Sequence, residues 1–161
     1  NLKETINYPI NSEKIKNLAR EIIGDEVSKE IIIDKLLNFV SEYIEDDYEN
    51  NTTSVFDIIK NKKGDCTEHA LLFTTLARSL GIPTKEITGW AYDFNGNYVL
   101  HAWNEVAFDF EGDTFWIPVD PTWNEVIPRY HIKSSGKNVF SKDYKIFFKE
   151  AKFADGEIIQ N

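Results

Sequence analysis

In the first half of the chain, apolar residues recur at helical spacing and charged or polar residues fill the positions between them. Ser12 is a suitable N-cap for the first such segment, and Gly24 closes it. Another apolar run follows a turn at Gly64 and Asp65, and Gly81 with the nearby Pro83 stops it. The pattern predicts helices over residues 12–24, 28–48, 54–60 and 66–80.

The second half changes to the alternating period of β-strands. Asn95, Gly96 and Asn97 are a hairpin turn signal, and Glu111-Gly112-Asp113 marks the next turn. Helices followed by an antiparallel meander predict an α+β fold, with the N-terminal helices packed on an antiparallel sheet. The expected strands are Lys85–Phe94, Tyr98–Phe110, Thr114–Asp120 and, in the tail, Lys142–Lys149.

Composition narrows the class of protein. The chain has 161 residues, of which 42% are hydrophobic and 14% aromatic, so we expect a single folded domain over residues 1–161. A formal charge of −9 disfavours nucleic acid and anionic lipid surfaces as partners. No apolar run of about 18 residues occurs, so no membrane span is expected.

Cys66 is the only cysteine, which excludes an intramolecular disulfide and a thiolate-rich zinc site. It follows Gly64 and Asp65 at a predicted helix start, where unpaired N–H groups and the helix dipole favour thiolate. The alternative is a small core residue. We expect no metal and no cofactor, because His-x-x-x-His and similar ligand spacings are absent.

A thiolate nucleophile needs a base, and the chain offers three histidines. His101 lies in a predicted strand, a stiff support for a base, although it could equally be an ordinary half-buried strand residue. His69 shares the helix of Cys66 and has poor geometry for the task. His131 lies in a polar, irregular stretch and is expected to be solvated. His101 is therefore the candidate base.

Asp120 ends a predicted strand and could orient the imidazole of His101. The alternative is an Asx turn before Pro121. Two other charged residues have plain structural explanations. Glu68 lies in the first helical turn, where an acidic side chain interacts favourably with the helix dipole, and Arg78 lies on the outer face of the last turns, where a cation does.

Three segments together resemble the transglutaminase-like superfamily. They are Gly64–Ala70 (GDCTEHA), His101–Val106 (HAWNEV) and Trp116–Trp123 (WIPVDPTW). The resemblance implies a papain-like α+β fold, a Cys66–His101–Asp120 triad and acyl transfer through a thioester. It covers a motif core of residues 51–123, after a helical lead-in of 1–50 and before a strand tail of 124–161.

The sequence departs from the animal transglutaminases, which place a Trp upstream of the nucleophile as an oxyanion donor. Asn51 falls near that place, with a helix-capping role as its alternative, and the backbone N–H of Cys66 is the safer donor. Trp103 and Trp123 are substrate-cleft candidates, although large aromatic residues usually pack in a core. The short chain resembles the compact microbial branch, in which no metal is expected.

The resemblance favours hydrolysis of peptide or amide bonds by water over crosslinking to an amine. The alternative is a non-catalytic protein-binding or scaffold module of the same fold. We expect a protein or peptide substrate. The chain contains no Met, which is expected of a processed or trimmed form that could be one domain of a larger protein. The compartment stays open between bacterial cytoplasm and cell envelope.

Overall fold

The chain divides into two structural units in the computed structural model. The first unit comprises Asn1–Ile87 and Ala102–Ile127, and the second comprises Thr88–His101 and Pro128–Asn161. Each unit is described by itself. The structure describes residues 2, 4–49, 52, 54–93, 95–128, 131–133, 152–154 and 157–159.

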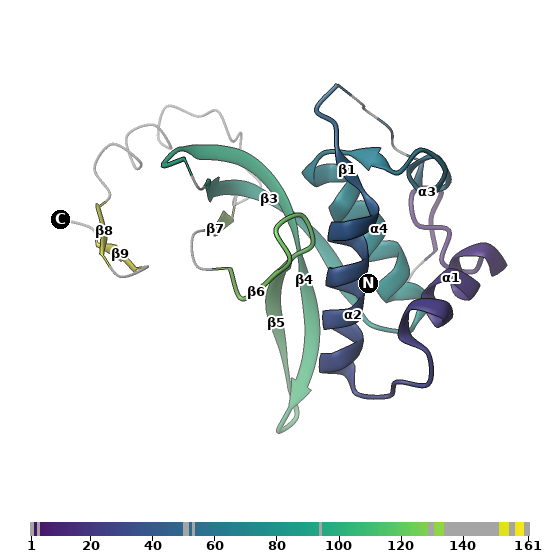
Figure 1. Cartoon of the computed structure of the whole chain (residues 1–161). Helices are drawn as coiled ribbons and strands as arrows, with labels where there is room; N and C mark the ends of the chain where they lie inside the picture. Colours follow the sequence, from purple (N-terminus) through teal and green to yellow (C-terminus); the bar gives the residue numbers. More distant parts are fainter. Residues whose placement is uncertain are drawn as a thin grey trace. The chain divides into compact units, whose positions relative to one another are not determined.

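The helices of the described residues all belong to the first unit (Figure 1). The expected helix over 28–48 stops early, at Tyr43, because Ile44 takes an extended conformation with φ −100° and ψ 120°. Glu45–Asp46 then forms β1, which pairs in parallel with β2, Lys63–Gly64. The helices are α1 (Glu13–Ile23), α2 (Lys29–Tyr43), α3 (Val55–Asn61) and α4 (Cys66–Ser79).

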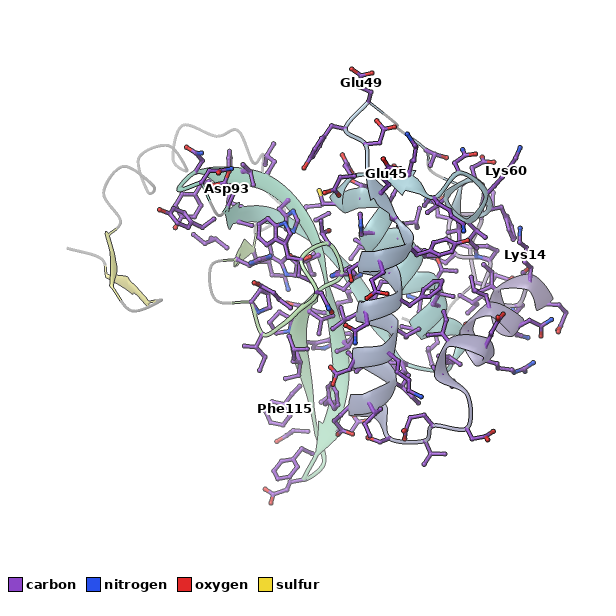
Figure 2. All side chains as sticks on the ribbon, in the orientation of Figure 1. Lys14, Glu45, Glu49, Lys60, Asp93 and Phe115 are labelled. Carbon is purple, nitrogen blue, oxygen red and sulfur yellow. The ribbon has the colours of Figure 1, made fainter. Side chains whose placement is uncertain are left out.

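Helix α4 is the centre of this unit and packs against α1, α2 and α3. Leu72, Phe73 and Leu76 are fully buried. Burial of each such side chain contributes about 1.5–3 kcal/mol to stability, so the core fixes α4 firmly. Charged side chains such as Lys14, Glu45 and Lys60 lie at the periphery of the helical part (Figure 2).

The sheet has the strand order β6-β5-β4-β3-β7. In the first unit β4 and β5 form an antiparallel hairpin with register from Asn104↔Val119 to Phe110↔Asp113. Glu111 and Gly112 both have positive φ, 51° and 90°, which suits the tight turn between these strands. The strands are β3 (Thr84–Tyr92), β4 (Tyr98–Phe110), β5 (Asp113–Asp120), β6 (Glu125–Val126) and β7 (His131–Lys133).

In the second unit, β3 pairs antiparallel with β7, from Gly89↔Lys133 to Ala91↔His131. Strands β8 (Lys152–Ala154) and β9 (Glu157–Ile159) form a separate antiparallel pair. The expected tail strand Lys142–Lys149 lies outside the described residues.

The α+β class and the antiparallel sheet expected from the sequence are confirmed. Among the residues that the structure describes, no helix is both long enough and apolar enough to cross a membrane.

Candidate active site

Cys66 is the first residue of α4, as the sequence predicts, and its thiol is free and half-buried. The backbone just before it is fixed by the pairing of β1 with β2: Asp46 lies opposite Gly64, and the N–H of Asp47 donates to the Gly64 carbonyl at 2.9 Å. The nucleophile candidate therefore follows a short strand after one intervening residue and starts a buried helix.

A capping box uses almost every backbone donor around the thiol. The Asp65 side chain accepts from the N–H of Thr67 at 2.7 Å and from that of Glu68, while Glu68 accepts from the Asp65 N–H at 2.8 Å. The N–H of His69 donates to the Asp65 carbonyl at 3.2 Å. No described residue accepts from the N–H of Cys66. That donor remains available beside the sulfur.

Glu68 is buried, with 3% of its surface exposed. Its second oxygen, Oε1, accepts from the N–H of Thr52 at 3.1 Å, so one carboxylate joins two separate backbone segments. Burial raises the pKa of Glu68, against the opposing effect of these backbone hydrogen bonds. Glu68 thus does more than favour the helix dipole, the role expected from the sequence, and its signal was an Asp followed three residues later by Glu, which is a capping-box pattern.

Gly64 makes room for this carboxylate. A Cβ at position 64 would overlap the Cβ of Glu68, and it would lie 2.5 Å from its Cγ. The glycine of the Gly-x-Cys-x-Glu pattern is thus explained by packing between β2 and the first turn of α4.

His69 is 1% exposed, and its Nδ1 lies 2.7 Å from the Asp65 carbonyl oxygen. A carbonyl only accepts hydrogen bonds, so Nδ1 carries the proton and donates. The His69 ring is therefore bound to the backbone at the start of α4. This contact agrees with the expectation that His69 is not the base.

His101 lies in β4 and is 6% exposed. Strand β4 belongs to both units: His101 is its last residue in the second unit, and from Ala102 onward it belongs to the first unit. His131 was wrongly expected to be solvated in an irregular stretch. It is half-buried at the start of β7, where pairing with β3 orders it, and its ring centroid lies 5.3 Å from that of His101.

Asp120 is fully buried at the end of β5, in the first unit with Cys66. Its Oδ1 accepts from the N–H groups of Thr122, at 2.9 Å, and Trp123, at 3.3 Å. The Asx turn considered in the sequence analysis is therefore present, and it fixes this carboxylate at the strand end.

The remaining site candidates have different outcomes. Trp103 is 2% exposed, in keeping with a core position, and Trp123 is half-buried. Asn51 lies outside the described residues.

Two further polar residues anchor the elements that carry the candidates. Asn104 is fully buried, and its Nδ2 donates to the Ala70 carbonyl at 3.1 Å and to Thr74 Oγ1 at 2.7 Å, which ties β4 to α4. Arg78, expected on an outer face, is instead half-buried and donates to the Thr84 carbonyl from Nε and Nη2, at 3.0 and 2.8 Å. The expectation for Arg78 was wrong because the chain turns back over the helix end.

Comparisons with known proteins agree with the motifs. The sequence model described as the transglutaminase-like superfamily matches residues 16–121, which is more than half of the chain. No curated protein sequence matches this chain.

Among solved structures, the fold is similar to a candidate cysteine protease from Cytophaga hutchinsonii, with a TM-score of 0.64 and 22% identity over 82% of this chain. It is also similar to the periplasmic domain of TgpA from Pseudomonas aeruginosa, with a TM-score of 0.57 and 22% identity over 76% of this chain. The matches cover only 44% and 46% of those two chains. At this identity the likeness shows the fold, an α+β papain-like core.

Proposed function

Because this chain belongs to the transglutaminase-like superfamily, we propose that it transfers acyl groups through a thioester on Cys66. His101 acts as the acid and base, and Asp120 orients its ring. The observation that carries the proposal is at the start of α4, where the chain's only thiol lies beside a backbone N–H that no described residue uses. A nucleophile and an oxyanion donor on one residue suit attack on a carbonyl carbon.

In the first half-reaction, the Cys66 thiolate forms a bond to the carbonyl carbon of an amide. The negative charge that develops on the carbonyl oxygen is stabilised by the Cys66 N–H and by the positive end of α4. His101 then gives its proton to the leaving nitrogen, the C–N bond breaks, and a thioester remains.

In the second half-reaction, an acceptor attacks the thioester while His101 takes its proton, and the C–S bond breaks to return the thiolate. We propose water as the acceptor and a peptide or protein as the substrate, so that the enzyme is a peptidase or amidase. The likeness to a structure described as a candidate cysteine protease supports water over an amine. We further propose that the chain is a domain of a larger protein, since it spans under half of that relative.

A non-catalytic binding module with the same fold is the second candidate. It is favoured by the burial of His101, which is 6% exposed, and by its ring contact with His131, since both also suit a purely structural histidine.

An activated ester separates the two candidates without knowledge of the natural substrate. With p-nitrophenyl acetate, we expect a burst of p-nitrophenolate equal to the amount of protein, from acylation of Cys66, followed by slower turnover. Cys66→Ala should lose the burst and His101→Ala should slow it by about 10²- to 10⁴-fold, the range for loss of a general base. Acylation no faster than that of free cysteine would favour the module.

A further inference from the structure

We propose that Glu68 is a positioning residue for acylation, whose carboxylate ties the backbone just before the nucleophile to the Thr52 segment so that the Cys66 N–H meets the developing oxyanion. The inference rests on the proposed function and adds to it a residue that does not touch the reacting atoms. Four observations, all within the first unit, support it.

The first observation is that the two oxygens of the Glu68 carboxylate accept hydrogen bonds from different backbone segments. Oε2 accepts from the N–H of Asp65 at 2.8 Å, and Oε1 accepts from the N–H of Thr52 at 3.1 Å. Asp65 is the residue before Cys66, and Thr52 belongs to the segment that leads into α3. One side chain therefore fixes the Gly64–Asp65 peptide, one residue before the nucleophile, and joins it to the segment that contains Thr52.

The second observation is that this anchor determines which donor stays available. The N–H groups of Asp65, Thr67 and Glu68 all donate within the capping box, and the Cys66 N–H does not. If Glu68 released the Asp65 N–H, the Asp65–Cys66 peptide would be held only from its far side, where the Asp65 carbonyl accepts from His69, and its orientation would be less tightly fixed. An oxyanion donor has to lie within about 0.3 Å of its ideal distance, so a small rotation removes much of its effect.

The third observation is packing. Gly64 lies directly under the stem of Glu68, in a space that any larger residue would fill. The backbone of β2 and the carboxylate stem therefore fit against each other, which keeps the side chain in a single place.

The fourth observation is burial. Glu68 is 3% exposed and carries a carboxylate whose removal from water is unfavourable, as the raised pKa of the group reflects. A capping box on a solvent-exposed helix provides similar hydrogen bonds without that cost. A function at the neighbouring thiol explains why the buried arrangement is present.

Two reactions of the same sulfur test the proposal. Iodoacetamide alkylates Cys66 by displacement at a saturated carbon, in which no oxyanion forms, whereas p-nitrophenyl acetate acylates it through an oxyanion. The measured quantity is the ratio of the acylation rate to the alkylation rate. Glu68→Gln keeps the length but places an amide NH₂ against one N–H, and Glu68→Asp keeps the charge but shortens the reach. We expect the ratio to fall by about 10- to 100-fold in both variants.

The pH profile of alkylation separates positioning from a charge effect. If Glu68 acts through its charge, Glu68→Gln shifts the alkylation profile to lower pH, Glu68→Asp leaves it in place, and the ratio stays constant in both. If Glu68 only supports the fold, both rates change together as the thermal midpoint falls. Either result overturns the proposal.

Glu86→Gln is the matched control, because Glu86 is a half-buried carboxylate of the first unit whose pKa burial also raises. Its ratio should equal that of the wild type. Thr52→Pro is a further variant that removes the backbone donor to Glu68 and leaves Glu68 intact, and it should lower the ratio by about threefold, roughly the worth of one net hydrogen bond. Because it also removes the hydroxyl that accepts from the Ser54 N–H, Thr52→Ala, which removes the hydroxyl alone, is its control and should leave the ratio unchanged.

The proposed function and this inference fail in different ways. A wild-type chain that is alkylated at Cys66 but not acylated there overturns both. A wild-type chain that is acylated, with an unchanged ratio in the folded Glu68 variants and in Thr52→Pro, overturns only the role of Glu68.

Discussion

The two ends of α4 each hold a buried or half-buried carboxylate, and the two are held by different kinds of group. At the N-terminal end, Glu68 accepts from two backbone N–H groups, those of Thr52 and Asp65, next to Cys66. At the C-terminal end, Glu86 interacts with the side chains of Tyr8, Thr74 and Arg78. Both carboxylates have pKa values raised mainly by burial.

The surroundings of these carboxylates differ in what they fix. Around Glu68, the capping-box hydrogen bonds fix the backbone in the first turn of α4, and the Cys66 N–H is not used in them. Around Glu86, Arg78 reaches the carbonyl of Thr84 and lies 4.1 Å from the ring centroid of Tyr8, so it joins the N-terminal segment, α4 and β3. Under the proposed function, we therefore expect changes at the first end to affect chemistry and changes at the second end to affect stability.

The largest effect is expected from the nucleophile. Cys66→Ala should reduce turnover by at least about 10⁴-fold, because no other thiol exists to form the thioester. The thermal midpoint should change by less than about 2 °C, since Cys66 is half-buried and a small residue replaces a small one. Turnover and calorimetric unfolding would be measured on the same preparation. A large fall in stability would contradict the division between the two ends.

The next effect concerns the histidines. His101→Ala should lower turnover by about 10²- to 10⁴-fold through loss of the acid and base. His69→Gln should act mainly on stability, because its Nδ1 is bonded to the Asp65 carbonyl within the helix start. The measurement is turnover at saturating substrate beside the urea midpoint. Loss of turnover in His69→Gln alone would mean that the base is misassigned.

His131→Gln is the matched histidine control. Its ring is 5.3 Å from that of His101, so a change of up to about tenfold in turnover is expected through displacement of the neighbouring ring. A loss equal to that of His101→Ala would instead give His131 a direct part in the reaction.

At the opposite end, Arg78→Ala should lower the free energy of unfolding by about 2 kcal/mol, because a charged donor with two hydrogen bonds is lost and the Thr84 carbonyl is left unpaired. Turnover of the folded fraction should stay within about twofold of the wild type. Urea unfolding and the acylation burst check the two parts. The free energy of unfolding of Arg78→Lys should fall between those of the wild type and Arg78→Ala, since a lysine cannot donate two hydrogen bonds from a planar fork.

The sequence predicts an element of the fold well where neighbouring residues alone determine its bounds. The predicted bounds of β4, Tyr98–Phe110, agree with the structure, because turn residues and alternation mark both ends. The start of α4 at Cys66 follows from Gly64 and Asp65. Helix α2 was predicted too long because nothing local announces that Glu45–Asp46 pairs with Lys63–Gly64.

The parts that sequence reasoning missed depend on distant partners. Besides the Ala70 carbonyl and Thr74 Oγ1, the Asn104 amide donates to the Lys85 carbonyl at 3.4 Å. These acceptors lie 34, 30 and 19 residues away in the sequence, so no short sequence window reveals why an amide is buried there. His131 is ordered by pairing of a three-residue strand with β3, which periodicity cannot detect in so short a segment. The exposure of Arg78 was misjudged for the same reason, because its acceptor follows the turn at Gly81.

The smallest effect tests whether the two ends of α4 are independent. A carboxyl group whose pKa is raised on folding binds its proton more tightly in the folded chain. Its contribution to stability is therefore largest below its ordinary pKa of 4.5 and is lost as pH rises from there through the folded pKa. The pKa values of Glu26, Glu30 and Asp93 are lowered instead. The stability that these three groups contribute is lost as pH falls below their ordinary pKa values of 4.5, 4.5 and 3.8.

Between pH 4.5 and 7, Glu86→Gln should accordingly lose less stability than the wild type, measured as the change in the urea midpoint over that range. Glu68→Gln should also lose less stability than the wild type over this pH range. The 14 residues of α4 span about 20 Å, so the two reductions should add in the double variant. A double variant that equals either single one would show that the ends titrate as one system. Stability and chemistry could then not be assigned to separate ends of the helix.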